Sequence, residues 1–128
     1  MKRTLLLSLL VCSSLTLFTG CAVLLVGAAA GAGGVAYTQG ELKNTESVAL
    51  NTAHHAAERA VKDLKFAVLK SQLDGLNGLI EARTVSDQKV TIKTKQIAAK
   101  ATEVRIRVGL LGDEGASRQI LSRMQTNY

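Results

Sequence analysis

Two adjacent histidines are the first candidates for metal or acid–base chemistry. His54 and His55 fall in a stretch predicted to be helical, where neighbouring side chains point about 100° apart. One helix face therefore cannot bring both rings to one metal ion, and no Cys, Asp or Glu completes a recognised ligand spacing with them. We expect ordinary histidines on the helix surface and no metal site.

Nucleophilic catalysis would need an activated serine or cysteine. None of the serines lies in a G-x-S-x-G motif, which places a nucleophile on a sharp turn between a strand and a helix. Asp113 and Arg107 invite a catalytic interpretation, but a helix N-cap and a solvated strand arginine explain them more simply. The sequence predicts no catalytic residues and no enzymatic activity.

Basic residues point outward from two predicted strands, 89–97 and 102–108. If these strands pair, the basic side chains form a surface suited to an anionic lipid, a glycan or a partner protein. The alternative is that they only solvate an exposed sheet face and protect it from aggregation. The residues of this predicted surface are Lys89, Lys93, Lys95, Arg105 and Arg107.

Cys21 is the residue with the most specific chemical context. The order Phe18-Thr19-Gly20-Cys21 resembles the lipobox of bacterial lipoproteins, although Phe18 stands where leucine is usual. In that motif the cysteine thiol is joined to diacylglycerol, the chain is cut just before the cysteine, and the new amine is acylated. The resemblance implies cleavage between Gly20 and Cys21, with lipid such as palmitate on Cys21.

Residues 1–20 have the organisation of a secretory signal peptide. Lys2 and Arg3 form a positive start, and an apolar run from Leu5 to Phe18 follows. Two alternatives remain open, an ordinary cleaved secretory signal and an uncleaved membrane anchor from Leu5 to about Tyr37. The lipoprotein interpretation predicts a lipid-anchored protein of the cell envelope.

The residue after the cysteine favours one membrane. Ala22 is not the aspartate associated with retention in the inner membrane. We therefore expect the periplasmic face of the outer membrane of a Gram-negative bacterium.

Composition limits what the mature chain can be. Removing 20 residues from 128 leaves 108, enough for one small domain. No disulfide is expected, because Cys12 lies in the signal peptide and Cys21 is the lipid site. The chain has 16 basic and 10 acidic residues, and loss of Lys2 and Arg3 leaves 14 minus 10, or +4. With two Tyr, two Phe and no Trp it lacks a base-stacking platform, so nucleic acid is not an expected partner.

Residues 21–36 are predicted to be a membrane-proximal tether rich in glycine and alanine. As a helix, the 15 residues from Ala22 to Ala36 would extend about 22 Å, short of the roughly 30 Å hydrocarbon core. Gly27 and Gly31 have the spacing that lets helices pair in lipid, so helical self-association is an alternative. The G-x-G-x-x-A match at Gly31, Gly33 and Ala36 is not followed by the helix that dinucleotide binding requires.

Residues 37–128 are predicted to form a single α+β domain. The pattern favours a small antiparallel sheet of about four to five strands, with two helices on one face, in the order β-α-β-β-β-β-α. Helix Val48 to about Lys65 has Ser47 as its expected N-cap and an alanine-rich apolar stripe, and helix Glu114–Gln125 has Asp113. Asp74-Gly75 and Asn77-Gly78 are predicted turns. The predicted strands are 37–42, 66–72, 79–85, 89–97 and 102–108.

Several of these segments resemble the DUF3568 family of small bacterial lipoproteins. They are Tyr37–Leu42, the alanine-rich helix, Val90–Lys93, Ile106–Gly109, Gly112–Glu114 and Ser117–Leu121. The resemblance implies a lipoprotein, the cell envelope and an α+β domain. It implies no activity, because the family name marks a domain of unknown function.

The expected function is therefore that of a membrane-anchored envelope lipoprotein acting as a non-enzymatic interaction or structural module. An envelope protein or an anionic polymer is the expected partner, with no cofactor other than the acyl lipid on Cys21. The alternative is a periplasmic binding or sensor domain for a small anionic ligand. A pocket with convergent polar groups would favour that alternative.

Overall fold

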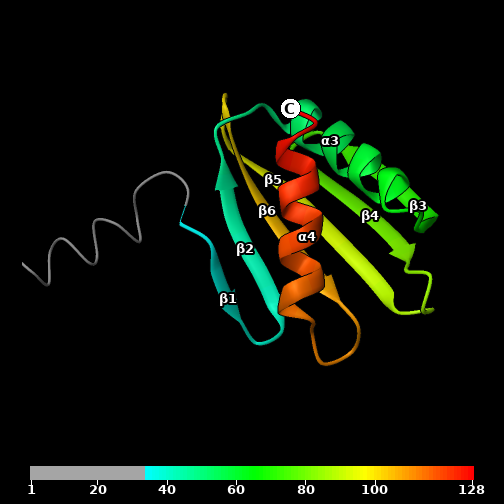
Figure 1. Ribbon diagram of the computed structural model, residues 1–128. Coiled ribbons are helices and arrows are strands. Elements are labelled where there is room, and N and C mark those ends of the chain that lie inside the picture. Colours follow the sequence, from blue (N-terminus) through cyan, green and yellow to red (C-terminus); the bar gives the residue numbers. More distant parts are fainter. Residues whose placement is uncertain (1–33) are drawn as a thin grey trace, which may run out of the picture. The chain divides into compact units, whose positions relative to one another are not determined.

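A six-stranded antiparallel sheet is the framework of the protein in its computed structural model, which describes residues 34–128 (Figure 1). The strands lie side by side in the order β1-β2-β6-β5-β4-β3. Their bounds are β1 Ala36–Thr38, β2 Glu41–Glu46, β3 Ala67–Asp74, β4 Asn77–Arg83, β5 Lys89–Ala98 and β6 Ala101–Val108. The predicted signal peptide, Cys21 and almost all of the predicted tether lie outside the described residues.

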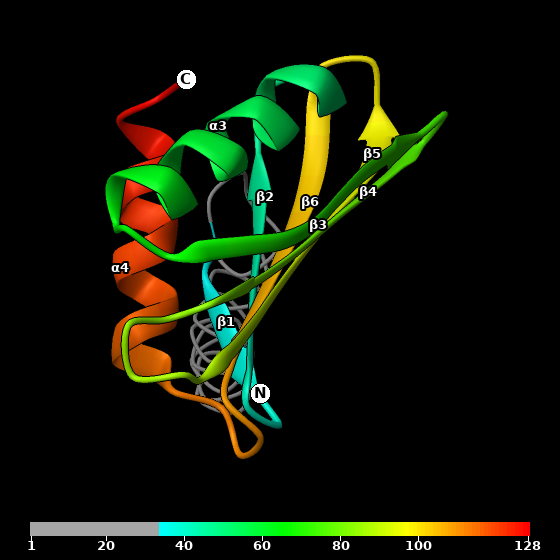
Figure 2. The ribbon, with the colours of Figure 1, turned by 90° about the vertical axis from the view of Figure 1, so that its right-hand side faces the viewer.

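Two helices of the described chain, α3 (Leu50–Asp63) and α4 (Glu114–Gln125), cover the same face of the sheet (Figure 2). Helix α3 packs on β3 to β6, and α4 packs on β2, β6 and α3. The predicted α+β class, with both helices on one face, is confirmed, but the predicted strand count was too low. Within residues 34–128, neither helix is long and apolar enough to cross a membrane.

The alanine stripe of α3 lets this helix approach the sheet closely. Ala53, Ala56, Ala57 and Ala60 are all 0% exposed and pack within the core. Their small side chains leave the volume between the layers to branched residues of the sheet, such as Ile92. The middle of the predicted stripe is confirmed. At its start Ala49 is exposed and Leu50 is buried instead, and at its end Leu64 is half-buried and caps the helix, which stops at Asp63.

Strict alternation in β5 and β6 separates a buried face from a solvated face. Val90, Ile92 and Thr94 of β5 are buried. Val104, Ile106 and Val108 of β6 are buried as well. The alternation that directs the basic residues outward is confirmed. The polar residues between the buried ones form the face that carries no helix, which we call the open face.

The predicted single strand 37–42 was wrong, because the chain turns back within it. Gln39 and Gly40 have positive φ values of 53° and 78°, and they join β1 and β2 as an antiparallel hairpin. A left-handed pair of residues reverses the chain where an extended strand would continue. The observed order is therefore β-β-α-β-β-β-β-α.

The predicted N-cap of α3 and the predicted turn at Asn77-Gly78 were also wrong. The N-cap of α3 is Ala49, not Ser47, and no side chain caps the helix there. The Asn77-Gly78 pair begins strand β4 rather than forming a turn. The β3–β4 hairpin turns instead at Gly75-Leu76, since Asp74 already pairs with Asn77.

The long crossover through α3 sets the order of the strands. After β2 the chain runs through α3 to β3 at the far edge, and β3 to β6 then return across the sheet as successive hairpins. Strand β6 thereby pairs with β2, which places Lys43 opposite Arg105. The N-terminal hairpin becomes one side of the surface that β5 and β6 form.

Candidate functional site

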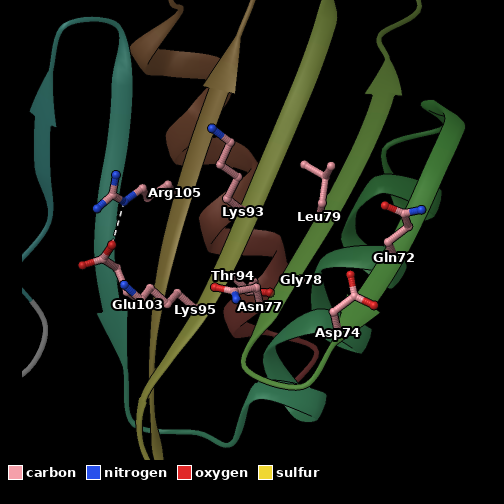
Figure 3. Close-up of a pocket in the computed structure, with 10 residues that line it drawn as sticks. All are labelled: Gln72, Asp74, Asn77, Gly78, Leu79, Lys93, Thr94, Lys95, Glu103 and Arg105. Atoms are coloured by element: carbon pink, nitrogen blue, oxygen red, sulfur yellow. Dashed lines mark hydrogen bonds and ion pairs between the residues drawn. The ribbon is translucent and has the colours of Figure 1, made fainter.

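The open face is the candidate site, because every strand from β2 to β6 directs polar side chains to it. Figure 3 looks onto this face and shows Arg105, Lys93, Leu79 and Gln72 in one row across four strands. The strand register extends this row to Lys43 on β2. The row therefore begins with three cationic side chains on three adjacent strands.

The five basic residues predicted for this surface all lie on the open face. Lys93 stands directly opposite Arg105, and Arg107 stands opposite Thr91. Lys95 lies opposite Glu103, while Lys89 at the start of β5 lies opposite Arg83. Strands β5 and β6 do pair, which brings like charges close together at Lys93 and Arg105.

Glutamates on neighbouring strands neutralise part of this charge. Glu103 forms ion pairs with two cations: its Oε2 lies 3.0 Å from Lys43 Nζ, and its Oε1 lies 2.6 Å from Arg105 Nε. Glu81 receives Lys89 Nζ at 2.9 Å, and the hydrogen bond from Lys89 lowers the pKa of Glu81. Burial raises the pKa of Glu103, but the bonds from Lys43 and Arg105 more than offset this and leave the pKa low. Both carboxylates are therefore charged at neutral pH.

Lys93 and Lys95 remain available to a ligand. Among residues 34–128, no carboxylate lies within 4.0 Å of either ammonium group. They flank a shallow hollow of about 410 Å³ on the open face (Figure 3). The hollow is lined by Gln72, Asp74, Asn77, Gly78, Leu79, Lys93, Thr94, Lys95, Glu103 and Arg105.

The predicted site did not include Lys43 or the glutamates of this face. Glu41 and Lys43 belong to the part of β2 next to the unexpected hairpin, and Glu41 Oε1 lies 3.7 Å from Arg105 Nη1. Only the pairing of β2 with β6 brings them to the basic strands. The alternation of Glu41, Lys43 and Thr45 in β2 was the signal that could have identified them.

The second cluster of polar groups joins α3 to β3. His54, predicted on the helix surface, is 3% exposed, so that prediction was wrong. It lies one turn after buried Leu50 on the face toward the β3–β4 hairpin. Its Nε2 is 3.0 Å from Ser71 Oγ, and Ser71 Oγ donates to Glu58 Oε1 at 2.5 Å.

These bonds fix the orientation of the three side chains. The single hydroxyl proton of Ser71 goes to Glu58, so the proton between Ser71 and His54 belongs to the imidazole Nε2. A protonated Nε2 cannot act as a base toward Ser71. Burial lowers the pKa of His54 despite nearby Glu58, and the bond from Ser71 lowers the pKa of Glu58. The cluster is a polar clamp between α3 and β3.

The remaining candidates have structural partners. Asp113 Oδ1 accepts a hydrogen bond from Ala116 N at 2.9 Å, which confirms it as the N-cap of α4. Arg107 Nη2 donates to the backbone oxygen of Leu110 at 2.8 Å. In the part of the chain that the structure describes, no group of three His, Cys, Asp or Glu side chains could hold a metal ion.

Comparison with known proteins identifies the family. No curated protein matches the chain. A family model described as "Protein of unknown function (DUF3568)" matches residues 4–127, nearly the whole sequence. The chain therefore belongs to the DUF3568 family.

Proposed function

We propose that this protein is a lipid-anchored lipoprotein of the bacterial envelope, whose domain binds an anionic partner on its open face without catalysing a reaction. The observation that carries the proposal is the row Lys43, Arg105 and Lys93 on three adjacent strands. Lys95, two residues after Lys93 in β5, adds a fourth cation on the same face. Phosphate or carboxylate groups repeated along a polymer, or displayed on an envelope protein, match such a row.

Several features support the anchored, non-enzymatic part of the proposal. Thr19-Gly20-Cys21 follows an apolar segment of signal-peptide length, and Ala22 suits the periplasmic face of the outer membrane. Asp113 and Arg107, the residues that most invited a catalytic role, are engaged in capping and in a loop contact. The acyl lipid on Cys21 is the one covalent group in the proposal.

A small anionic ligand is the second candidate. The hollow beside Lys93 offers the amide groups of Gln72 and Asn77 next to the cations, a combination suited to a carboxylate or phosphate. A small anionic molecule would bind within the hollow only. A polymer would extend along the row to Lys43.

Charge reversal tests the binding face. The double variant Lys93→Glu/Arg105→Glu should bind an anionic polymer such as heparin much more weakly, with a smaller dependence of binding on salt. The matched control is Arg59→Glu/Arg123→Glu, which makes the same change in net charge at exposed positions on the two helices. Equal loss of binding in both variants would reject the face and leave only non-specific attraction.

Intact mass tests the anchor. Protein isolated from the membrane fraction should lack residues 1–20 and carry diacylglycerol and fatty acid on Cys21. An unmodified cysteine, or a retained signal segment, would reject the lipoprotein assignment without affecting the charge-reversal result.

Competition with heparin by inorganic phosphate or a small dicarboxylate separates the two ligand classes. A small anion should saturate a site confined to the hollow, but it should compete poorly with a polymer that binds along the whole row.

A further inference from the structure

Three loops lie at the end of the sheet where β6 leads into α4. They are the β1–β2 turn at Gln39-Gly40, the β4–β5 loop 84–88, and the β6–α4 loop 109–112 (Figure 1). Leu110 and Leu111 are each 90% exposed, and Val85 in the neighbouring loop is 83% exposed. The next most exposed large hydrophobic residue in the described chain, Leu76 at the opposite end of β4, is 61% exposed. Single exposed leucines are ordinary, but an adjacent pair standing almost fully in water is costly.

The loop that carries the two leucines is held in place at both ends. Gly109 N donates to Lys89 O at 2.8 Å, and Arg107 donates to Leu110 O at 2.8 Å. At the other end, Gly112 packs on Gly40, where a Cβ on Gly40 would lie 2.5 Å from Leu111 O. The leucines are thus presented on a preorganised loop rather than on a loose one.

The charges at this end are largely paired with one another. Ion pairs join Arg83 Nη1 to Asp87 Oδ1 at 3.0 Å and Arg118 Nη2 to Glu114 Oε1 at 2.8 Å. A third ion pair joins Lys89 Nζ to Glu81 Oε1 at 2.9 Å. The basic open face has a different character, since Lys93 and Lys95 there have no carboxylate within ion-pair distance in the described chain. A surface that binds the loop end would therefore be selected by apolar contact and not by charge.

We propose that Leu110, Leu111 and Val85 insert into the lipid surface to which Cys21 is anchored. The inference rests on the proposed lipid anchor, because the anchor supplies the nearby surface. Residues 21–34 separate the lipid site from the start of the domain, and 14 residues reach at most about 48 Å when fully extended. Strand β1 has only three residues before the turn that packs on Leu111.

A segment of this length allows the loop end to reach the membrane. Apolar side chains that enter the boundary between headgroups and acyl chains penetrate about 5–10 Å, which side chains at loop tips can do without unfolding. The proposed diacylglycerol and fatty acid on Cys21 are enough to hold the protein at the membrane, so the leucines are not needed for attachment itself. Their contact with lipid orients the domain, with the loop end against the membrane.

The chain contains no tryptophan, so one introduced tryptophan is a clean probe. Leu111→Trp in the full lipoprotein, reconstituted in neutral phosphatidylcholine vesicles, should emit at shorter wavelength than in detergent-free buffer and be quenched by brominated lipid. The matched control is Leu76→Trp, in the β3–β4 turn at the opposite end of β4, whose emission should remain that of an indole in water. The shift should persist at high salt, because no net charge drives it.

A second variant guards against effects of tryptophan itself. Leu110→Ser/Leu111→Ser should keep the wild-type melting temperature, since both side chains are exposed. In unacylated Cys21→Ser protein, the same double change should lower partition into neutral vesicles by about tenfold or more, given the apolar surface removed.

The outcomes separate this inference from the proposed anchor. If the Leu111→Trp variant floats with vesicles while its indole stays in water, the inference is overturned and the anchor is intact. Equal shifts in the two tryptophan variants overturn the proposed orientation. Should Cys21 prove unmodified, partition of the unacylated chain still decides whether the leucines bind lipid.

Discussion

Gly78 is glycine because two buried polar side chains occupy the space of its side chain. A Cβ at this position would lie 2.6 Å from His54 Nδ1 and would overlap Thr94 Oγ1. Both atoms are buried and have no hydrogen-bond partner within the described residues. Neither can shift freely, because His54 is held by Ser71 and Thr94 lies in a central strand.

We therefore expect Gly78→Ala to destabilise the protein by about 1–3 kcal/mol, the usual range for overpacking a core. Thermal unfolding followed by circular dichroism measures this effect. Gly115→Ala in α4 is the control, because its added methyl meets only Asp113 Oδ1 at 3.5 Å and alanine favours a helix. The packing argument fails if the two variants melt at the same temperature.

His54 also makes stability depend on pH. Its pKa lies below the ordinary 6.5 because burial disfavours the charged ring, and Glu58 offsets only part of that effect. Between the lowered folded value and 6.5, the unfolded chain binds more protons than the folded chain. The free energy of unfolding should therefore be highest above pH 6.5 and fall as the pH is lowered through this window.

The contribution of Glu58 belongs to a lower window. Its pKa is lowered from 4.5, so its contribution is present above pH 4.5 and is lost below it.

The free energy of unfolding, measured by urea titration at several pH values from about 7.5 to 5, should depend less steeply on pH in His54→Gln than in the wild type. The same pH dependence in both proteins would mean that the imidazole does not titrate in this window.

The two helices of the described chain begin in different ways. Helix α4 has the Asp113 side chain on Ala116 N and an acidic residue, Glu114, in its first turn. Helix α3 starts at Ala49 with no side-chain cap and no acid in its first turn. Its stability must therefore come from the buried alanine stripe rather than from its terminus.

This contrast predicts that Asp113→Ala costs about 1 kcal/mol of stability. Asp113→Asn should stay close to the wild type, because asparagine caps a helix nearly as well as aspartate. The free energy of unfolding from a urea titration distinguishes the two variants. A large loss in Asp113→Asn would point to a role for the charge beyond capping.

Across the whole molecule, glycines from distant parts of the sequence form one close contact. Gly40 belongs to the first hairpin and Gly112 to the loop before α4. A Cβ on Gly112 would overlap the Gly40 backbone, and a Cβ on Gly40 would lie 2.5 Å from Leu111 O. Through this contact the β1–β2 turn supports the loop that presents Leu110 and Leu111. The N-terminal hairpin therefore helps to shape the proposed membrane-facing end.

Gly112→Ala should destabilise the protein by about 2–4 kcal/mol, from left-handed backbone strain and overlap with the Gly40 backbone. Gly109→Ala is a matched control with similar strain, since φ is +72° there and +87° at Gly112, but its nearest neighbour is 3.9 Å away. Hydrogen exchange should show faster opening of β1 and β2 only in Gly112→Ala. Equal effects of both changes would leave backbone strain as the whole cause.

Local patterns in the sequence determined the α+β class, the α4 helix with its cap, and the buried faces of β5 and β6. Alternation of apolar and polar residues shows which side chains of a strand share its buried face, and it does so without reference to the neighbouring strand. Tertiary structure alone decided that β2 pairs with β6, which brings Lys43 and Glu103 together. It also buried His54 under the β3–β4 hairpin and set Gly40 against Gly112. Such contacts join residues far apart in the chain, and they depend on the crossover through α3, which no local period encodes.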